Sequence, residues 1–231
     1  MDGGFETFIL VLQDFRVGPA IFNVLFLLAI FVPLMIITVL SVSLLLDSIN
    51  FKYDRATRLV FLIPGLITVA VAVIFWSSVV GYEVVWDKSN IRWMIGVISF
   101  STGIGSWIVI QYGSLRSISQ EVLEAGVVDG CNRFQLAWRL KLPMISRYVA
   151  YMVILLIVGA LQIFNEPNLL KFSNMTTDWS PSQIAFTYAF KNADFAGGVA
   201  LSLIMLIPNV ILALLFILNT DFMKKSRNAW N

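Results

Sequence analysis

The sequence predicts an all-α integral membrane protein with five transmembrane helices. Of its 231 residues, 58% are hydrophobic and only 13% are charged, and the mean hydropathy is +0.83, whereas soluble domains carry about 25% charged residues. Charged residues are absent from five runs, each close to or above the ~17–25 residues that a helix needs to cross a bilayer. These runs are continuously apolar, whereas the strands of a membrane barrel alternate.

The uncharged runs define the predicted spans, at residues 17–46, 59–82, 93–115, 148–165 and 195–220. The shortest run also suits a buried core helix of a large soluble protein. The chain has too little polar sequence, however, to cover a core made from all five runs. We therefore expect residues 17–231 to form one transmembrane domain.

Residues 1–16 contain an apolar patch that is too short to cross a bilayer. Glu6, Asp14 and Arg16 interrupt this patch. No basic n-region or small-residue cleavage site is visible, so we predict no signal peptide. We expect instead a helix lying in the outer membrane interface. Within the first span, Pro33 predicts a kink.

The second and third spans each contain a local signal. Pro64 and Gly65 predict a bend in the second span. At its outer end, a group of aromatic residues is typical of an interfacial belt, with a ligand platform as the alternative; the group is Trp76, Tyr82 and Trp86. The third span carries a group of small residues that predicts close helix packing, with a substrate path second; these are Ser101, Thr102, Gly103, Gly105 and Ser106.

The last third of the chain predicts one more outer element. Residues 176–194 are expected to form an amphipathic helix that begins near Ser180-Pro181, because proline suits the first helical position. The fifth span contains Pro208, which predicts another kink.

The positions of Lys and Arg predict the orientation. If residues 116–147 are cytoplasmic, eleven of the sixteen Lys and Arg residues lie on the cytoplasmic side and five on the other. The positive-inside rule then predicts an outer N-terminus and a cytoplasmic C-terminus. A net charge of +2 is too small to indicate a nucleic-acid partner, and basic residues at helix ends suit lipid headgroups.

The sequence lacks the residues needed for a disulfide, for common zinc sites and for ATP binding. The chain has one cysteine, Cys131, and no histidine, which excludes an internal disulfide and removes the commonest zinc ligand and the usual general base. No GxxxxGK[ST] phosphate-binding loop is present. We therefore predict no catalytic residue, no metal site and no ATPase activity in this chain.

The stretch Glu121–Ile145 is a polar interruption between two long apolar runs. Ser117-x-x-Gln120 and Asn132-x-x-Gln135 both fit capping boxes, and Gly130 lies between them, where a left-handed turn would end the first helix. The pattern predicts a short helix, a glycine turn and a second short helix that stops near Pro143. Small residues and two carboxylates around the turn suit docking against another protein, with an ordinary solvated loop as the alternative.

The same stretch carries a family signature. Glu124-Ala125-Gly126, Asp129-Gly130-Cys131, Leu140 and Leu142-Pro143 resemble the EAA…DGA…I.LP signature of permease subunits of binding-protein-dependent ATP-binding-cassette (ABC) importers. In that family the loop docks on the ATPase subunit. The resemblance implies these ATPase-coupling residues: Glu121, Glu124, Ala125, Gly126, Asp129, Gly130, Leu140 and Pro143.

The resemblance has four departures and a finer branch. Gly126 and Cys131 replace alanines of the signature, small for small. Ser119 stands where a proline often precedes the motif, and Ala137 occupies a position that is frequently aromatic, with Phe134 and Trp138 nearby to supply aromatic bulk. The segments LQIFNEPNLL (161–170), Tyr188-Ala189-Phe190 and 197–202 resemble the carbohydrate branch, specifically the maltose-type first permease. That branch usually begins with a further spanning helix, so this chain matches the core of a type I importer permease alone.

The resemblance implies partner subunits and a cellular location. ATP and magnesium would bind to separate ATPase subunits, and a homologous second permease and an extracytoplasmic solute-binding protein would complete a transporter in the bacterial cytoplasmic membrane. An ion-gradient-driven secondary transporter of a neutral polar solute is the alternative, although its usual ionisable residues at the bilayer midplane are missing from the five runs. A membrane-embedded enzyme is a third alternative, but the chain has no His and no paired intramembrane carboxylates from which to build a catalytic site.

Uncharged spans suit a neutral solute, and a sugar or sugar derivative fits both the chemistry and the resemblance. The candidates for a substrate path carry hydroxyl, amide, carboxylate or aromatic groups: Trp107, Gln111, Tyr112, Gln162, Asn165 and Glu166.

Overall fold

The computed structural model describes residues 4–48, 59–85, 87, 90–174 and 178–219, and every regular element among them is helical. Four of these helices are long and apolar enough to cross a membrane, and a bent pair raises the number to five. The predicted all-α membrane fold is thus confirmed. Some residues used in the predictions lie outside the described ranges: Lys52, Arg55, Arg58, Trp86, Lys88, Lys224, Lys225 and Arg227.

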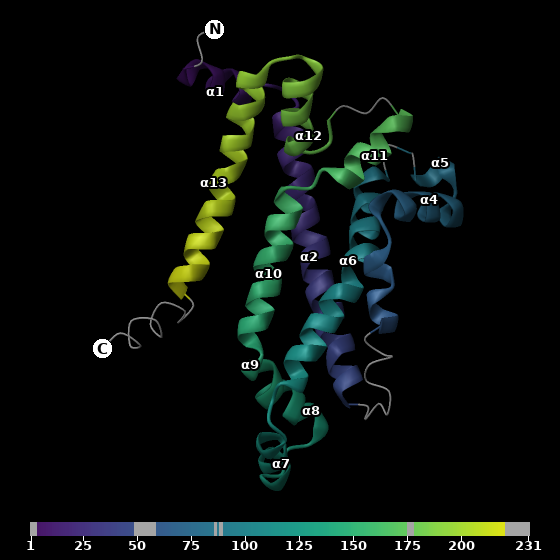
Figure 1. Ribbon diagram of the computed structural model, residues 1–231, viewed down its shortest axis with the longest axis vertical. Coiled ribbons are helices and arrows are strands. Elements are labelled where there is room, and N and C mark those ends of the chain that lie inside the picture. Colours follow the sequence, from purple (N-terminus) through teal and green to yellow (C-terminus); the bar gives the residue numbers. More distant parts are fainter. Residues whose placement is uncertain (1–3, 49–58, 86, 88–89, 175–177, 220–231) are drawn as a thin grey trace.

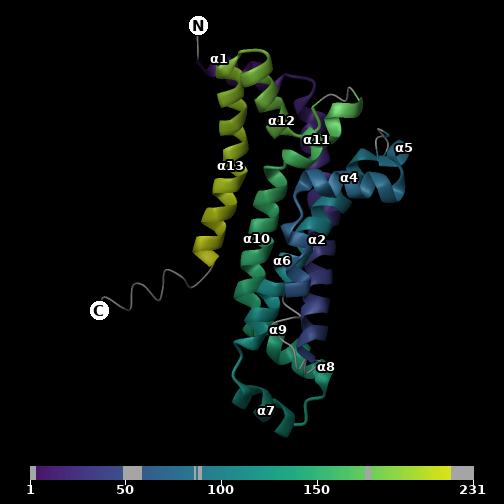
Figure 2. The same ribbon diagram turned by 45° about the vertical axis from the view of Figure 1, so that its right-hand side comes forward.

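Three long helices form the centre of the molecule. The helices α2 (Val17–Ser48), α6 (Ile91–Arg116) and α10 (Ser146–Leu161) run side by side along the long axis (Figure 1). A fourth, α13 (Phe195–Asn219), lies beside α10 and diverges from it toward its C-terminal end in both ribbon views (Figure 2). Pro33 and Pro208 lie inside helices that continue through them.

The predicted second span is broken rather than continuous. The helical stretch Leu59–Leu66 and α4 (Val69–Val80) meet at an angle of 92°, so α4 lies across the long axis (Figure 1). The break contains the short 3-10 helix η1 (Pro64–Leu66). Thr68 then starts a new helix, because its side-chain oxygen accepts a hydrogen bond from the Val71 amide at 3.5 Å.

Glycines set the path of the broken span against α6. A Cβ atom on Gly105 would overlap the carbonyl oxygen of Phe61, and one on Gly65 would overlap the Ser106 hydroxyl. Higher up, the Trp76 indole donates a hydrogen bond to Ser101 at 3.0 Å. Gly105, Ser106 and Ser101 therefore serve helix packing, the first of the two predicted roles, whereas Thr102 and Gly103 line a cavity. Trp76 ties α4 to α6.

Short helices close the two ends of the bundle. At the end drawn uppermost lie α1 (Phe5–Leu12), α12 (Pro181–Phe186) and the π-helix η3 (Thr187–Lys191) (Figure 1). The α11 helix (Asn165–Asn174) and α5 (Tyr82–Val85) lie toward the same end. The opposite end is formed by α7 (Gln120–Val128), α8 (Arg133–Gln135), the π-helix η2 (Leu136–Lys141) and α9 (Leu142–Met144).

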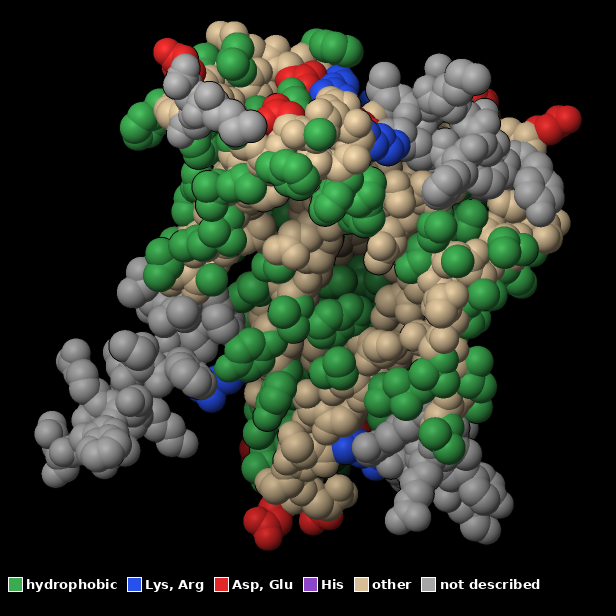
Figure 3. Space-filling view, turned by 45° about the horizontal axis from the view of Figure 1, so that its top comes forward, with side chains coloured by type: hydrophobic (Ala, Val, Ile, Leu, Met, Phe, Trp, Pro, Cys, Tyr) green, Lys and Arg blue, Asp and Glu red, His purple; other side chains and the backbone are tan. Residues whose placement is uncertain are grey.

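The core is divided along the axis of the bundle. One apolar cluster joins α2, α4, α6, α10 and α11 in the upper half, and a second joins α2, α6 and α10 in the lower half. A third holds α1, α12 and α13 together with the start of α2. Hydrophobic side chains cover much of the flank, whereas acidic and basic ones gather at the two ends (Figure 3). This distribution suits a bundle whose sides face lipid.

Candidate functional sites

The helix-turn-helix at the lower end forms as the sequence predicts, with one difference. Gly130 adopts φ +84° at the turn, and Asn132 and Gln135 form the predicted capping box, with bonds of 2.8 and 2.9 Å. The predicted capping box at Ser117 is wrong. Its hydroxyl donates instead to the Ser114 carbonyl at 2.7 Å, and α7 begins at Gln120, after Ser119, without a side-chain cap.

Two of the signature residues face the interior of this segment. Gly126 is the buried residue of α7, and a Cβ atom there would lie 2.9 Å from Leu136 and 3.7 Å from Leu140. Glycine at this position lets α7 approach η2 closely. Gly126 and Leu140 therefore hold the two helices together and do not form part of the exposed face.

The remaining signature residues are exposed. Glu121, Glu124, Ala125, Asp129, Gly130 and Pro143 are all exposed. Among them stand large apolar side chains: Val128 is 87% exposed, Phe134 75% and Trp138 64%. The Phe134 and Trp138 rings stack with centroids 6.3 Å apart. Exposed apolar side chains of this size are typical of a surface that contacts another protein or the membrane. Val128 was not among the predicted coupling residues, although it directly precedes the predicted Asp129-Gly130 turn.

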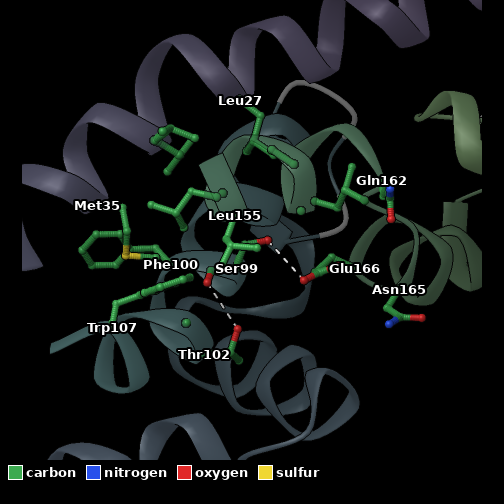
Figure 4. A pocket seen from close by; sticks show the side chains of 18 of the residues that line it. Leu27, Met35, Ser99, Phe100, Thr102, Trp107, Leu155, Gln162, Asn165 and Glu166 are labelled. Atoms are coloured by element: carbon green, nitrogen blue, oxygen red, sulfur yellow. Dashed lines mark hydrogen bonds between the residues drawn. The ribbon is translucent and has the colours of Figure 1, made fainter. Parts of the chain in front are cut away.

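A cavity of about 430 Å³ opens between α2, α6, α10 and α11 in the upper half of the bundle. Its polar groups gather at one side, where the Ser99 hydroxyl donates to the Glu166 carboxylate at 3.3 Å (Figure 4). Thr102 lies next to Ser99 and donates to its carbonyl oxygen at 3.3 Å. Apolar and aromatic side chains, including Phe100 and Trp107, line the opposite side.

Four of the six predicted substrate-path residues line this cavity: Trp107, Gln162, Asn165 and Glu166. Gln111 and Tyr112 do not. The Gln111 side chain is buried and donates to the Tyr148 carbonyl at 3.1 Å, and Tyr112 is buried in the lower apolar cluster. Gln111 lies one helical turn beyond Trp107 on the cavity-lining stripe of α6, but at that level α10 packs directly against it. Ser99 was missed, although it lies on the same stripe.

Charged groups tie α1 to the upper end. Asp14 accepts hydrogen bonds from Arg16 at 2.6 Å and from the Tyr188 hydroxyl at 2.6 Å, and Arg16 also pairs with Asp178 at 3.0 Å. The Arg16 bonds, with help from Tyr188, hold the pKa of Asp14 well below its usual range, and burial and the Asp14 bond raise the pKa of Tyr188. This network fixes the entry to α2.

No family model matches the chain, but curated proteins do. A probable starch degradation products transport permease, AmyC of Thermoanaerobacterium thermosulfurigenes, is 24% identical over 87% of this chain and 74% of its own length. An osmoprotective compounds uptake permease, GgtC of Synechocystis, is 21% identical over 90% and 83%. An alpha-glucoside transport permease, AglF of Rhizobium meliloti, is 26% identical over 52% and 35%.

Solved structures show the same fold. A bacterial ABC transporter that imports the acidic polysaccharide alginate superposes with a TM-score of 0.71 at 16% identity, covering 94% of this chain and 84% of that one. The same score and identity are found for the alginate transporter in complex with its alginate pentasaccharide-bound periplasmic protein, covering 92% and 81%. The bundle therefore has the fold of an ABC importer permease.

Proposed function

Because this multi-pass membrane chain is similar, over most of its length, to carbohydrate-type permeases of ABC transporters, we propose that it is one permease subunit of an ATP-driven importer. Separate ATPase subunits would bind ATP and magnesium. A second permease and an extracytoplasmic binding protein would complete the assembly, with the α7 end in the cytoplasm and the α1 end outside. The chain itself would supply a solute path and a surface that receives the ATPase.

The exposed α7 face carries this proposal. Glu124 and Asp129 offer carboxylates, Val128 and Phe134 offer apolar surface, and all four are exposed. The segment that carries them, from α7 to α8, forms the lower end of the bundle (Figure 1). Such a mixture suits a groove on a partner that is apolar with a basic rim. Gly126 fixes α7 on η2, so docking would push on a preformed unit rather than on a flexible loop.

The solute we propose is a neutral sugar or sugar derivative. Carbohydrates are bound by aromatic rings together with amide and carboxylate groups, and the cavity presents Trp107, Gln162, Asn165 and Glu166. The charged side chain lining it is a carboxylate, which would accept hydrogen bonds from hydroxyl groups and repel an acidic ligand. AmyC and AglF, named for starch products and alpha-glucosides, support this solute class.

Co-purification with the ATPase subunit tests the docking surface. Val128→Arg, alone and combined with Glu124→Arg, changes side chains that are exposed, so the chain should still fold and insert. We expect the ATPase to be lost from both variants. Glu83→Arg makes the same charge reversal on exposed α5 at the other end and should retain the ATPase. Full recovery with the double variant would refute the α7 face as the docking site.

A further inference from the structure

A carboxylate at the end of α2 joins three separate elements. The Asp47 side chain is only 8% exposed and forms ion pairs with Lys141 and Arg116. Lys141 is the last residue of η2 and Arg116 the last residue of α6. These three residues, the Asp47 cluster, thus connect α2, α6 and the segment that carries α7.

Both cations contact the Asp47 carboxylate, and Arg116 has a second partner as well. Lys141 donates a hydrogen bond to one Asp47 oxygen, and the Arg116 guanidinium lies 3.6 Å from the other. Arg116 also donates two hydrogen bonds to the Tyr112 hydroxyl, at 2.9 and 3.1 Å. Tyr112 is buried in the lower core of α2, α6 and α10. The cluster is therefore anchored in packed helices rather than placed on a mobile surface.

The Asp47 cluster is also connected to α7 through η2. The Gly126 contact packs α7 on η2, through Leu136 and Leu140, and Lys141 follows directly in the chain. An α7 that is pushed by a partner therefore carries Lys141 with it. Since Lys141 is 12% exposed and paired with Asp47, separating the two would leave a poorly solvated ammonium group without its partner and Asp47 with Arg116 alone, which is unfavourable.

We propose that Asp47 is a positioning residue that makes α2 and α6 follow the movement of the α7–α9 segment. The inference rests on the proposed function, because it presupposes an ATPase that drives α7. Docking surface and transmission are then separate parts of the chain: the exposed face of α7 receives the ATPase, and the Asp47 cluster transmits its motion to the helices that line the cavity. Loss of the cluster should uncouple ATP hydrolysis from uptake without releasing the ATPase.

The test uses the complete transporter in proteoliposomes, with ATP hydrolysis and solute uptake measured on the same preparation. Asp47→Asn and Lys141→Met each remove one charge of the pair. We expect both variants to retain the ATPase and to hydrolyse ATP, while the uptake per ATP falls about fivefold or more. Lys141→Arg keeps the charge and should restore the ratio. Arg139→Met removes an equal charge from an exposed position on the same π-helix and should leave it unchanged.

Each other outcome has a distinct meaning. An unchanged uptake per ATP in Asp47→Asn and Lys141→Met would overturn the inference and leave the proposed function standing. Loss of the ATPase, or loss of both variants from the membrane fraction, would overturn it too, since the cluster would then serve docking or folding. A wild-type chain that never retains an ATPase would instead refute the proposed function.

Discussion

Single glycines decide where helices of this bundle meet. Gly105 faces the backbone of Phe61 so closely that one added methyl group would overlap the carbonyl oxygen, and a backbone atom cannot move aside as a side chain can. Gly113 lies eight residues further along the same helix, and a methyl group added there would meet nothing within 4 Å. The two positions share helix, residue type and secondary structure but differ in contact.

That pair yields a stability prediction. Gly105→Ala should destabilise the protein by about 2 kcal/mol or more, through displacement of the broken span. Gly113→Ala should be neutral or stabilising by up to about 1 kcal/mol, since alanine favours helix. Thermal unfolding of the detergent-solubilised chain, followed by tryptophan fluorescence, measures both. Equal melting temperatures for the two variants would show that the Gly105 contact is not close.

At the scale of elements, the attachment of α1 depends on Asp14, whose pKa is lowered in the folded chain. A lowered carboxyl pKa stabilises the folded state above the unfolded value of about 4, and the contribution is lost only as pH falls further toward the folded value. Physiological pH changes therefore do not loosen this end.

The corresponding prediction compares the wild type with Asp14→Asn. The variant should melt at a lower temperature, and the gap should be the same at pH 7 and pH 5, because Asp14 stays charged at both. Exposed Glu6→Gln in α1 serves as the control and should show little gap at either pH. A gap that closes at pH 5 would contradict the lowered pKa of Asp14.

Some of the helices, turns and cavity contacts could be predicted from sequence patterns and others could not. Runs of uncharged residues located the long helices, and Gly130 and Asn132 located the turn before α8, because helix length and capping are local properties. The 92° break was only partly predictable: Pro64 indicates a bend, but its size depends on Thr68 and on the approach of Phe61 to Gly105. Whether a polar residue of α6 lines the cavity depends on α10, which is why Trp107 lines it and Gln111 does not.

Across the whole molecule, different features lie at the two ends and between them. The upper end holds an ion network around Arg16, the upper half of the bundle holds a cavity lined by one carboxylate, and the lower end presents α7 beyond the Asp47 cluster. In the proposed orientation the α7 end is cytoplasmic, as the positive-inside rule predicts. The arrangement suits a path between solvent compartments that is controlled from one end by a partner.

Solute uptake by proteoliposomes that contain this chain, its second permease, the ATPase and the binding protein would distinguish ATP-driven import from secondary transport. A radiolabelled neutral alpha-glucoside is the probe, with and without ATP, and with an ion gradient in place of ATP. We predict uptake that requires ATP and is not supported by the gradient. Uptake that follows the gradient without ATP would contradict the account and identify a secondary transporter.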